Sequence, residues 1–555
     1  MLEIKNLSIS FPGENGPIQA VKNLTLSLEK GKCLGIVGES GSGKSVSSLA
    51  LMQLLDDRAI IQGEAWLKTE SGSKNLLLSS EKEMQKIRGR KIAMIFQEPM
   101  TSLNPVYTVG HQVAEALKIH KICPAKQIKS RVIELFNQVK LPNPEEIYQR
   151  YPHEISGGQK QRVMIAMALS CKPDLLIADE PTTALDVTVQ KEIIQLLKDL
   201  QQEVDMGMIF ISHDLNLVGE IADDLAVMYR GDLVEYGSST EIFTKASHPY
   251  TKGLLACRPD LDTPKGPLLT IDYFLEGKEV SSQAFTPQNT LEEDILRVEN
   301  LSSWYPLKRN FFGKPIAWLK AVDQVSFSVR KGETLGLVGE SGCGKSSLGR
   351  TIIRLQEAHG GKVLFQGKDL LELSAREMRK VRKDIQLIFQ DPYASLNPRM
   401  TIGKAIQEPM EVHKIHPAKE RKAKTEELLK KVGLDESYFN RYPHELSGGQ
   451  RQRVGIARAL AVEPKCIICD ESVSALDVSV QAQVLNLLNQ LKEEFQLTYI
   501  FISHDLSVVK YMSDRLMVMN KGKIEEFGLA EDIYKNPQSA YTKKLIEAVP
   551  KSGSL

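Results

Sequence analysis

Two short stretches of this 555-residue chain decide its fold: "GESGSGKSV" (Gly38–Val46) and "GESGCGKSS" (Gly339–Ser347). Both fit the pattern G-x-x-x-x-G-K-[ST], and each follows an apolar run, "CLGIVG" or "TLGLVG", that is typical of a buried parallel strand. The glycines let the loop fold back so that its backbone N–H groups point at phosphate oxygens, and the helix that follows adds its positive end. A chance glycine turn is not expected twice in this setting, so each stretch predicts a phosphate cradle between a strand and a helix.

Length and composition indicate a multidomain globular protein. A chain of 555 residues is too long for one hydrophobic core. Lys plus Arg number 71 and Asp plus Glu number 70, so there is no basic excess and we expect no nucleic-acid partner. No run of eighteen apolar residues and no signal peptide at "MLEIKNLSIS" can be found, which predicts a cytosolic protein.

The seven cysteines are scattered, which is typical of free thiols in a cytosolic chain. Cys466 and Cys469 form a C-x-x-C pair that could indicate metal or redox chemistry. The pair lies in "KCIICDE", however, and the apolar run favours a buried strand.

The chain is an internal duplication. "YPHEISGGQKQRV" (Tyr151–Val163) returns as "YPHELSGGQRQRV" (Tyr442–Val454), and "IFISHDLNLV" returns as "IFISHDLSVV". "RNFFGKPIAWL" (Arg309–Leu319) has no full counterpart and is an insertion in the second half. The match stops over a stretch rich in Pro, Ser and Thr, with a short ordered piece expected at "TIDYFLEGKEV". We therefore predict a first domain at 1–257, a linker at 258–291 and a second domain at 292–555.

The motifs of each half supply the parts of a nucleoside triphosphatase. Lys44 and Lys345 should reach the β- and γ-phosphates, and the hydroxyls of Ser45 and Ser346 should bind Mg²⁺. The strands "LLIADEP" and "CIICDES" end in paired acids at the sheet edge where ligands bind. In these pairs Asp179 and Asp470 suit Mg²⁺, and Glu180 and Glu471 suit the attacking water, although an acidic N-cap is the plainer alternative. The predicted cradle residues are Gly38, Ser40, Gly41, Gly43, Lys44, Ser45 and Val46, then Gly339, Ser341, Gly342, Gly344, Lys345, Ser346 and Ser347.

A second anion-binding surface is predicted in each half. "SGGQ" opens a helix-like stretch, where a serine hydroxyl and glycine N–H groups form a site for negative charge. Its members are Ser156, Gly157, Gly158 and Gln159 in the first half and Ser447, Gly448, Gly449 and Gln450 in the second.

With these motifs the chain resembles the ATP-binding cassette (ABC) ATPases, whose signature is L-S-G-G-Q, over almost its whole length. The resemblance implies an α/β fold with two tandem cassettes, each a RecA-like α/β core with a helical subdomain, and ATP with Mg²⁺ as cofactors. It also implies that each ATP lies between the P-loop of one cassette and the signature of the other. By the same resemblance Gln97 and Gln390 sense Mg²⁺ and the γ-phosphate, His213 and His504 contact the γ-phosphate, and Asp186 and Asp477 belong to loops (D-loops) at the seam. Phe11 and Tyr305 match the aromatic that stacks on adenine, with a buried core role as the alternative.

The flanking segments are similar to those of dipeptide and oligopeptide importer ATPases. "QEPMTSLNP", "QDPYASLNP" and the tail "HPYTKGLL" carry this likeness, and the second tail, "SAYTKKLI", keeps only Tyr541 and Thr542. The likeness implies two transmembrane permease subunits as partners, docked on the segments after Gln97 and Gln390, and an extracytoplasmic solute-binding protein. The expected location is the cytoplasmic face of the inner membrane. Only Cys257 lies near the tail where relatives carry an iron–sulfur cluster, so we predict none. A tandem-cassette ATPase of the ribosome and a purely structural P-loop protein remain as alternatives.

Overall fold

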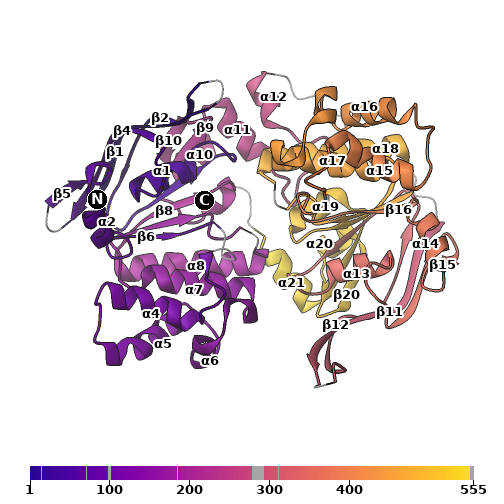
Figure 1. The fold of residues 1–555 in the computed structure, drawn as a ribbon, viewed down its shortest axis with the longest axis horizontal. Helices are drawn as coiled ribbons and strands as arrows, with labels where there is room; N and C mark the ends of the chain where they lie inside the picture. The colour runs from indigo at the N-terminus through magenta and orange to yellow at the C-terminus, as the bar shows by residue number, and fades with distance from the viewer. Residues whose placement is uncertain are drawn as a thin grey trace.

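The computed structural model contains two α/β units that lie side by side, joined by one chain (Figure 1). The structure describes residues 1–13, 16–69, 72–97, 102–183, 185–277, 293–310, 312–474 and 476–549. Within these ranges, every helix is too short or too polar to cross a membrane. The predicted docking segment of the first half lies partly outside the described residues, at 98–101.

Each unit is built on a six-stranded sheet whose parallel strands are the apolar runs of the sequence. The sheet order is β10-β9-β3-β8-β7-β6 in the first unit and β16-β17-β18-β13-β19-β20 in the second, and only β10 and β20 run antiparallel to their neighbours. The strands of the first are β3 (Cys33–Val37), β6 (Ile92–Ile95), β7 (Leu175–Asp179), β8 (Gly207–Ser212), β9 (Asp224–Tyr229) and β10 (Asp232–Ser238). Those of the second are β13 (Thr334–Val338), β16 (Ile385–Ile388), β17 (Cys466–Asp470), β18 (Thr498–Ile502), β19 (Arg515–Asn520) and β20 (Lys523–Leu529). The C-x-x-C pair lies on β17, where Cys466 and Cys469 are fully buried, as the apolar run predicts.

A four-stranded antiparallel sheet flanks each core sheet, in the orders β2-β1-β4-β5 and β12-β11-β14-β15. Its strands are β1 (Leu2–Phe11), β2 (Ile18–Leu28), β4 (Ile60–Thr69) and β5 (Gly72–Asn75), then β11 (Asp294–Arg309), β12 (Pro315–Arg330), β14 (Gly360–Phe365) and β15 (Lys368–Asp369). The inserted stretch Arg309–Leu319 lengthens the β11–β12 hairpin, which protrudes at the bottom of Figure 1.

Helices cover the core sheets, and each unit has a separate helical layer that includes the helix beginning at its signature. That layer is α4 (Val109–Ile119), α5 (Ile128–Gln138), α6 (Pro144–Gln149) and α7 (Gly157–Leu169), then α15 (Ile402–Val412), α16 (Arg421–Lys431) and α17 (Gly448–Leu460). The other α-helices of the first unit are α1 (Lys44–Leu51), α2 (Glu81–Ile87), α8 (Val187–Val204), α9 (Leu215–Gly219), α10 (Ser239–Lys245), α11 (Pro249–Ala256) and α12 (Ile271–Leu275). Those of the second are α13 (Lys345–Ile352), α14 (Ala375–Val381), α18 (Val478–Phe495), α19 (Leu506–Met512), α20 (Ala530–Lys535) and α21 (Ala540–Glu547). Single 3₁₀ turns are η1 (Leu76–Leu78), η2 (Ala125–Gln127), η3 (Pro152–Glu154), η4 (Glu436–Asn440) and η5 (Pro443–Glu445).

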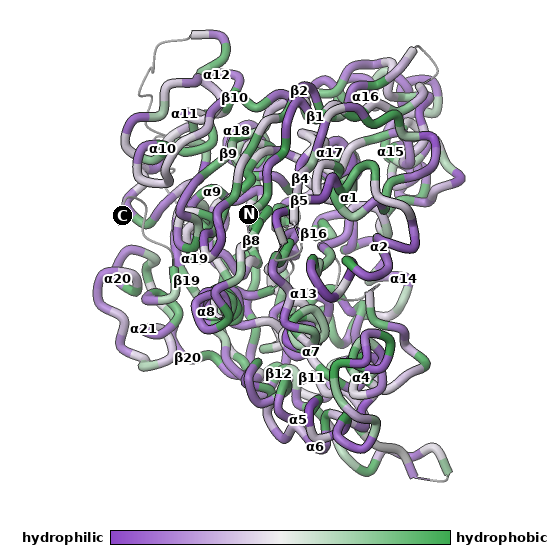
Figure 2. Tube along the Cα trace, turned by 90° about the vertical axis from the view of Figure 1, so that its left-hand side faces the viewer, coloured by the Kyte–Doolittle hydropathy of each residue, from purple (hydrophilic) through white to green (hydrophobic). Residues whose placement is uncertain are grey.

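The C-terminal helices of both units lie on one side of the molecule, opposite other helices of the same units. Figure 2 shows α10, α11, α12, α20 and α21 on one side and α2, α4, α14 and α15 on the other. The segment that leaves the first unit is bound to the second, because Leu268 exchanges two 2.8 Å hydrogen bonds with the side chain of Asn486 on α18. Leu268 and Ile271 also join a hydrophobic cluster with residues of both units. The described part of the predicted linker is therefore held against the second cassette.

Candidate functional site

The two glycine loops adopt a conformation that only glycine accepts at several positions. Gly43 has φ 101° and Gly344 has φ 110°, both in the left-handed region. A Cβ added there would lie 2.4 Å from the carbonyl oxygen of Ala20 and 2.0 Å from that of Ala321, respectively. The loop can therefore pack against the neighbouring strand only without a side chain, which leaves its amides to face the cradle.

The P-loop lysines lie buried across their own loops. Lys44 Nζ donates to the carbonyl oxygens of Gly38 at 2.7 Å and Glu39 at 2.8 Å. Lys345 Nζ makes the equivalent bonds to Gly339 and Glu340, at 2.7 and 3.0 Å. Burial lowers the pKa of Lys44, but nearby acids oppose that shift. Each ammonium is thus held at the mouth of a cradle, where a phosphate oxygen would be bound.

The hydroxyl and the carboxylate predicted to bind Mg²⁺ lie in direct contact. Ser45 Oγ donates to Asp179 at 2.9 Å, and Ser346 Oγ donates to Asp470 at 2.6 Å. The second oxygen of Asp470 is buried without a hydrogen-bond partner, with Arg350 3.7 Å away. Burial raises the pKa of Asp179 to about 6. A desolvated carboxylate beside a hydroxyl is a donor set that fits a hard divalent cation.

Both glutamates predicted to be catalytic lie in the left-handed backbone region, directly after their strands. Glu180 has φ 47° and Glu471 has φ 46°, an uncommon conformation for a residue with a long side chain and one that clusters at functional sites. Each is held there by its amide, which donates to Ile211 at 2.9 Å or to Ile502 at 3.0 Å. The repeated strain indicates that both carboxylates need this one direction.

The structure brings the predicted glutamate, glutamine and histidine together in both cassettes. Glu180 Oε2 accepts from Gln97 Nε2 at 3.1 Å and lies 3.3 Å from His213 Nδ1. In the second cassette Glu471 Oε2 accepts from Gln390 Nε2 at 2.7 Å and lies 3.5 Å from Nδ1 of His504. Three residues far apart in sequence thus form one cluster at the edge of each sheet.

The histidine keeps its glutamate ionised. Burial by itself raises the pKa of Glu180, but the hydrogen bond and charge of His213 outweigh burial and lower that pKa to about 2. The pKa of Glu471 is lowered in the same way by His504. Burial opposes the charged form of His213, yet the contact with Glu180 raises its pKa overall. Each glutamate therefore offers a charged oxygen that can orient water.

Each signature serine caps its own helix. Ser156 Oγ accepts from the amide of Gln159 at 3.3 Å while the Gln159 side chain accepts from the Ser156 amide at 3.0 Å. Ser447 and Gln450 repeat this capping box at the same distances. The amides of the glycines between them stay at the positive end of a thirteen-residue helix.

In each cassette the segment that follows the predicted catalytic glutamate, up to the first turn of α8 or α18, contacts the P-loop of the other cassette. The amide of Ser40 donates to Asp477 Oδ1 at 3.1 Å, and Ser479 Oγ contacts Glu39. On the other side Thr188, which donates to Asp186 at 2.6 Å, contacts Glu340 at 3.2 Å. The cassettes are therefore arranged head to tail, with Asp186 and Asp477 at the seam.

The signature lies directly behind that contact. A Cβ on Gly449 would lie 2.3 Å from a methyl carbon of Val480, and one on Gly158 would lie 2.8 Å from a methyl carbon of Val189. Val480 follows Ser479, so one helix start has the opposite P-loop on one side and its own signature on the other. This order fits an ATP shared between a P-loop and the opposite signature, which stays a prediction.

The two adenine-stacking candidates differ. Tyr305 is 38% exposed, and its hydroxyl lies 3.3 Å from Ser347 Oγ in the second P-loop helix and contacts Gln356. Phe11 is partly buried against the core of the first cassette. Tyr305 therefore lies beside its cradle, whereas the core role remains open for Phe11.

A tyrosine of each C-terminal segment supports the P-loop, which the sequence motifs did not reveal. The amide of Glu39 donates to the Tyr250 hydroxyl at 2.9 Å, and that of Glu340 to the Tyr541 hydroxyl at 3.0 Å. The only sequence signal for this support was that the tyrosine is present in both tails, although the residues before it differ. The loss of "HP" in the second tail is tolerated because Ser539 takes the capping role of His248.

Comparisons with known proteins agree with this geometry. The ABC transporter family profile matches residues 21–183 and 322–474, and that of the oligopeptide/dipeptide transporter C-terminal region matches 234–274 and 526–554. The chain is 48% identical over 560 residues to the glutathione import ATP-binding protein GsiA of Escherichia coli (strain K12), with 99% of this chain and 89% of that protein covered. The corresponding protein of Pectobacterium atrosepticum is 47% identical over 557 residues, with the same coverage.

One solved structure similar to a single cassette is the dimeric, post-hydrolysis form of the ATP-binding cassette MJ0796 with ADP and Pi. It is 29% identical, covers 42% of this chain and 98% of its own, and has a TM-score of 0.39.

The two matches to the oligopeptide/dipeptide transporter C-terminal region separate the importer from the ribosomal alternative, because they lie in the tails that distinguish importer ATPases. The chain belongs to the ABC transporter ATP-binding proteins, as an ATPase with two cassettes that each carry an oligopeptide/dipeptide transporter C-terminal region.

Proposed function

We propose that this chain binds two transmembrane permease subunits at the cytoplasmic face of the inner membrane and drives uptake of small peptide-like solutes. The observation that carries the proposal is an exposed apolar groove beside the γ-phosphate-sensing glutamine of the second cassette. The first cassette has exposed apolar residues at the equivalent positions. Such a surface marks a protein contact.

The groove of the second cassette has a volume of about 300 Å³ and lies between the core sheet and the helical layer. Leu355, Phe389, Pro409 and Val412 contribute its apolar lining. Leu355 is 50% exposed and Val412 is 53% exposed, and both line the same groove, so they belong to one exposed apolar surface. A short amphipathic helix of a partner fits a groove of this kind.

The first cassette exposes the equivalent side chains. Aligned through the motifs, Leu54 corresponds to Leu355, Phe96 to Phe389 and Ile119 to Val412. Leu54, Phe96 and Ile119 are 43%, 41% and 67% exposed. Two separate cassettes that keep the same exposed apolar positions support two separate permease contacts.

The groove of the second cassette is connected to its ATP site. Phe389 lines the groove, and the next residue, Gln390, donates to the catalytic Glu471. From the other wall Arg458 donates at 2.6 Å to the carbonyl oxygen of Ser395, which belongs to the predicted docking segment "DPYASLNP". A change at the glutamate can thus displace the docking surface through few contacts.

Mg²⁺ fits the Ser–Asp pair of each cradle, with Gln97 or Gln390 close by. Ser45 with Asp179, and Ser346 with Asp470, would hold the ion, which would neutralise charge on the phosphates. The chain's own groups then act on the reactants: the lysine binds phosphate oxygens, the ionised glutamate orients water, and the histidine holds the glutamate.

The solute class rests on relatives. Proteins of this kind in Escherichia coli and Pectobacterium atrosepticum are named for glutathione import, and the C-terminal profiles are named for oligopeptides and dipeptides. We infer that the solute is glutathione or another short peptide, selected by an extracytoplasmic binding protein.

The test is a membrane complex with altered grooves. Leu355→Asp places a charge in the groove of the second cassette, and Ile119→Asp places one at the equivalent exposed surface of the first. Both should abolish co-purification with the permease and uptake of labelled glutathione and dipeptides. Leu529→Asp, at an exposed leucine of the C-terminal face, is the matched control and should leave both unchanged. Full co-purification of both groove variants would refute the docking surface, and unchanged peptide uptake after gene deletion would refute the solute class.

A further inference from the structure

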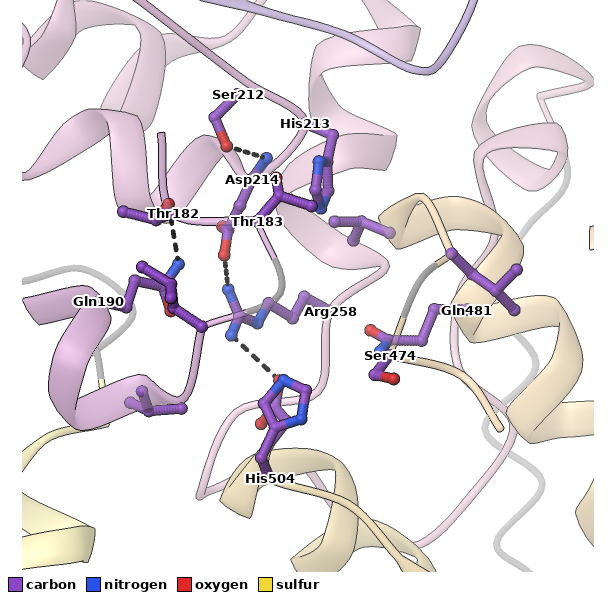
Figure 3. A pocket seen from close by; sticks show the side chains of 15 residues that line it. Thr182, Thr183, Gln190, Ser212, His213, Asp214, Arg258, Ser474, Gln481 and His504 are labelled. Carbon is purple, nitrogen blue, oxygen red and sulfur yellow. Dashed lines mark hydrogen bonds and ion pairs between the residues drawn. The ribbon is translucent and has the colours of Figure 1, made fainter. Parts of the chain in front are cut away.

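Arg258 lies between the two cassettes, just after the end of α11. Its side chain, 16% exposed, enters a cavity of about 90 Å³ lined by residues of both cassettes. One guanidinium nitrogen contacts Asp214 of the first cassette, and another donates to Asp505 of the second at 3.1 Å. Figure 3 shows Arg258 between the loops that carry His213 and His504.

Each aspartate uses its two oxygens for two different tasks. Asp214 Oδ1 accepts from the amides of Asn216 and Leu217 and so caps α9, while Oδ2 contacts Arg258. Asp505 divides its oxygens in the same way: Oδ1 caps α19, and Oδ2 accepts from Arg258. The arginine therefore joins the starts of two helices that lie in different cassettes.

Those helix starts directly follow the switch histidines. His213 precedes Asp214, and His504 precedes Asp505, so any shift of an aspartate moves its histidine. Because each histidine contacts its catalytic glutamate, one connected set of contacts runs from Glu180 through Arg258 to Glu471.

The electrostatics make this link hard to break on one side. Both aspartates are nearly buried, with 14% and 17% of their side chains exposed. Burial would raise the pKa of Asp214, but Arg258 and His213 lower it, so the carboxylate stays charged. A buried charge that loses its partner is strongly unfavourable, so both loops are held to one guanidinium.

The link exists once per molecule. Counting from Tyr250 and Tyr541, which occupy equivalent places in the two tails, the position of Arg258 corresponds to Val549 in the second cassette. The side chain of valine has no hydrogen-bond donor, so within the described residues Arg258 is not matched by an arginine at the equivalent place in the second cassette. This asymmetry agrees with a role for the segment that joins the cassettes.

We propose that Arg258 is a positioning residue that couples the two ATP sites by joining their switch-histidine loops. The proposal goes beyond the transport function and rests only on ATP hydrolysis, so it can be tested on the full chain without permease or solute. With Arg258 present, a defect at one glutamate should disturb the other site. Without it, the two sites should turn over independently.

The experiment compares Glu180→Gln in different backgrounds by phosphate release. With Arg258 intact, Glu180→Gln should leave less than a tenth of the wild-type turnover. In the Arg258→Met background, adding Glu180→Gln should leave about half of the turnover of Arg258→Met alone. Arg258→Lys keeps the charge but not the two-sided guanidinium contact, and it should also leave about half, which protects the test if Arg258→Met does not fold. Arg58→Met removes an exposed arginine paired only with Asp56 and should behave as wild type.

The result is read as a ratio, so a general loss of stability does not produce it. Equal fractional losses with and without Arg258 would overturn the proposal. A wild-type background in which Glu180→Gln already leaves half of the turnover would overturn it as well, because the sites would then be independent with the arginine in place.

Discussion

Replacing both catalytic glutamates by glutamine tests the active-site assignment most directly. Glu180 Oε2 faces three donors: Gln97 Nε2 at 3.1 Å, Thr183 Oγ1 at 2.9 Å and Nδ1 of His213 at 3.3 Å. In Glu180→Gln these donors can be satisfied only by the amide oxygen. The amide nitrogen must then occupy the position of Oε1, so a hydrogen-bond acceptor for water becomes a donor.

The size of the effect follows from that exchange. Glutamine has nearly the same shape, so the backbone conformation at φ 47° and the hydrogen bonds of Lys44 to its own loop should be unchanged. Loss of a positioned base lowers turnover by roughly 10²-fold or more, which is about 2.7 kcal/mol in activation free energy. The variant that combines Glu180→Gln with Glu471→Gln should therefore bind ATP normally but hydrolyse it at least about a hundredfold more slowly.

Phosphate release and equilibrium ATP binding measure the two parts separately. Glu203→Gln, at an exposed position near the end of α8, is the control and should match the wild type. Turnover of the double variant within about threefold of wild type, with ATP still bound, would refute the role given to the two carboxylates.

Three further predictions concern the same sites. Tyr250→Phe together with Tyr541→Phe removes the hydroxyls that accept from the P-loop amides, so the Kd for ATP should rise several-fold while kcat stays near wild type; an unchanged Kd would contradict the support role. Burial raises the pKa of Asp179 from 3.8 to about 6, so the folded state binds more protons between these values and stability falls as pH rises through that window. Asp179→Asn should therefore stabilise the metal-free chain by about 3 kcal/mol at pH 8 but not at pH 3.5, as followed by urea unfolding. A cysteine at Ser40, an exposed serine of the P-loop, and one at Gly448, where an added side chain meets no atom within 4 Å, should crosslink within one chain when ATP is bound. Crosslinks found only between chains would show that whole molecules pair.

The sequence predicted the local structure around each motif, because that structure is encoded in short, contiguous patterns. A strand followed by a glycine loop and a helix can form in only a few ways, so Lys44 and Ser45 could be assigned without the fold. The acidic ends of β7 and β17 and the capping boxes of the signatures are equally local. Duplication strengthened each assignment, since every pattern occurs twice in the same order.

Only the tertiary structure revealed the contacts between residues that no short sequence pattern connects. Arg258 lies in a stretch that reads as linker, and nothing near it in sequence shows that it reaches Asp214 and Asp505. Tyr250 reads as part of a tail, and its hydroxyl meets a P-loop amide 211 residues away. Exposed apolar residues such as Leu355 look like core residues in sequence, because hydrophobicity does not state what covers a side chain. The physical reason is the same in each case: backbone propensity and periodicity act over a few residues, whereas these side chains are placed by packing between segments that are far apart in the sequence.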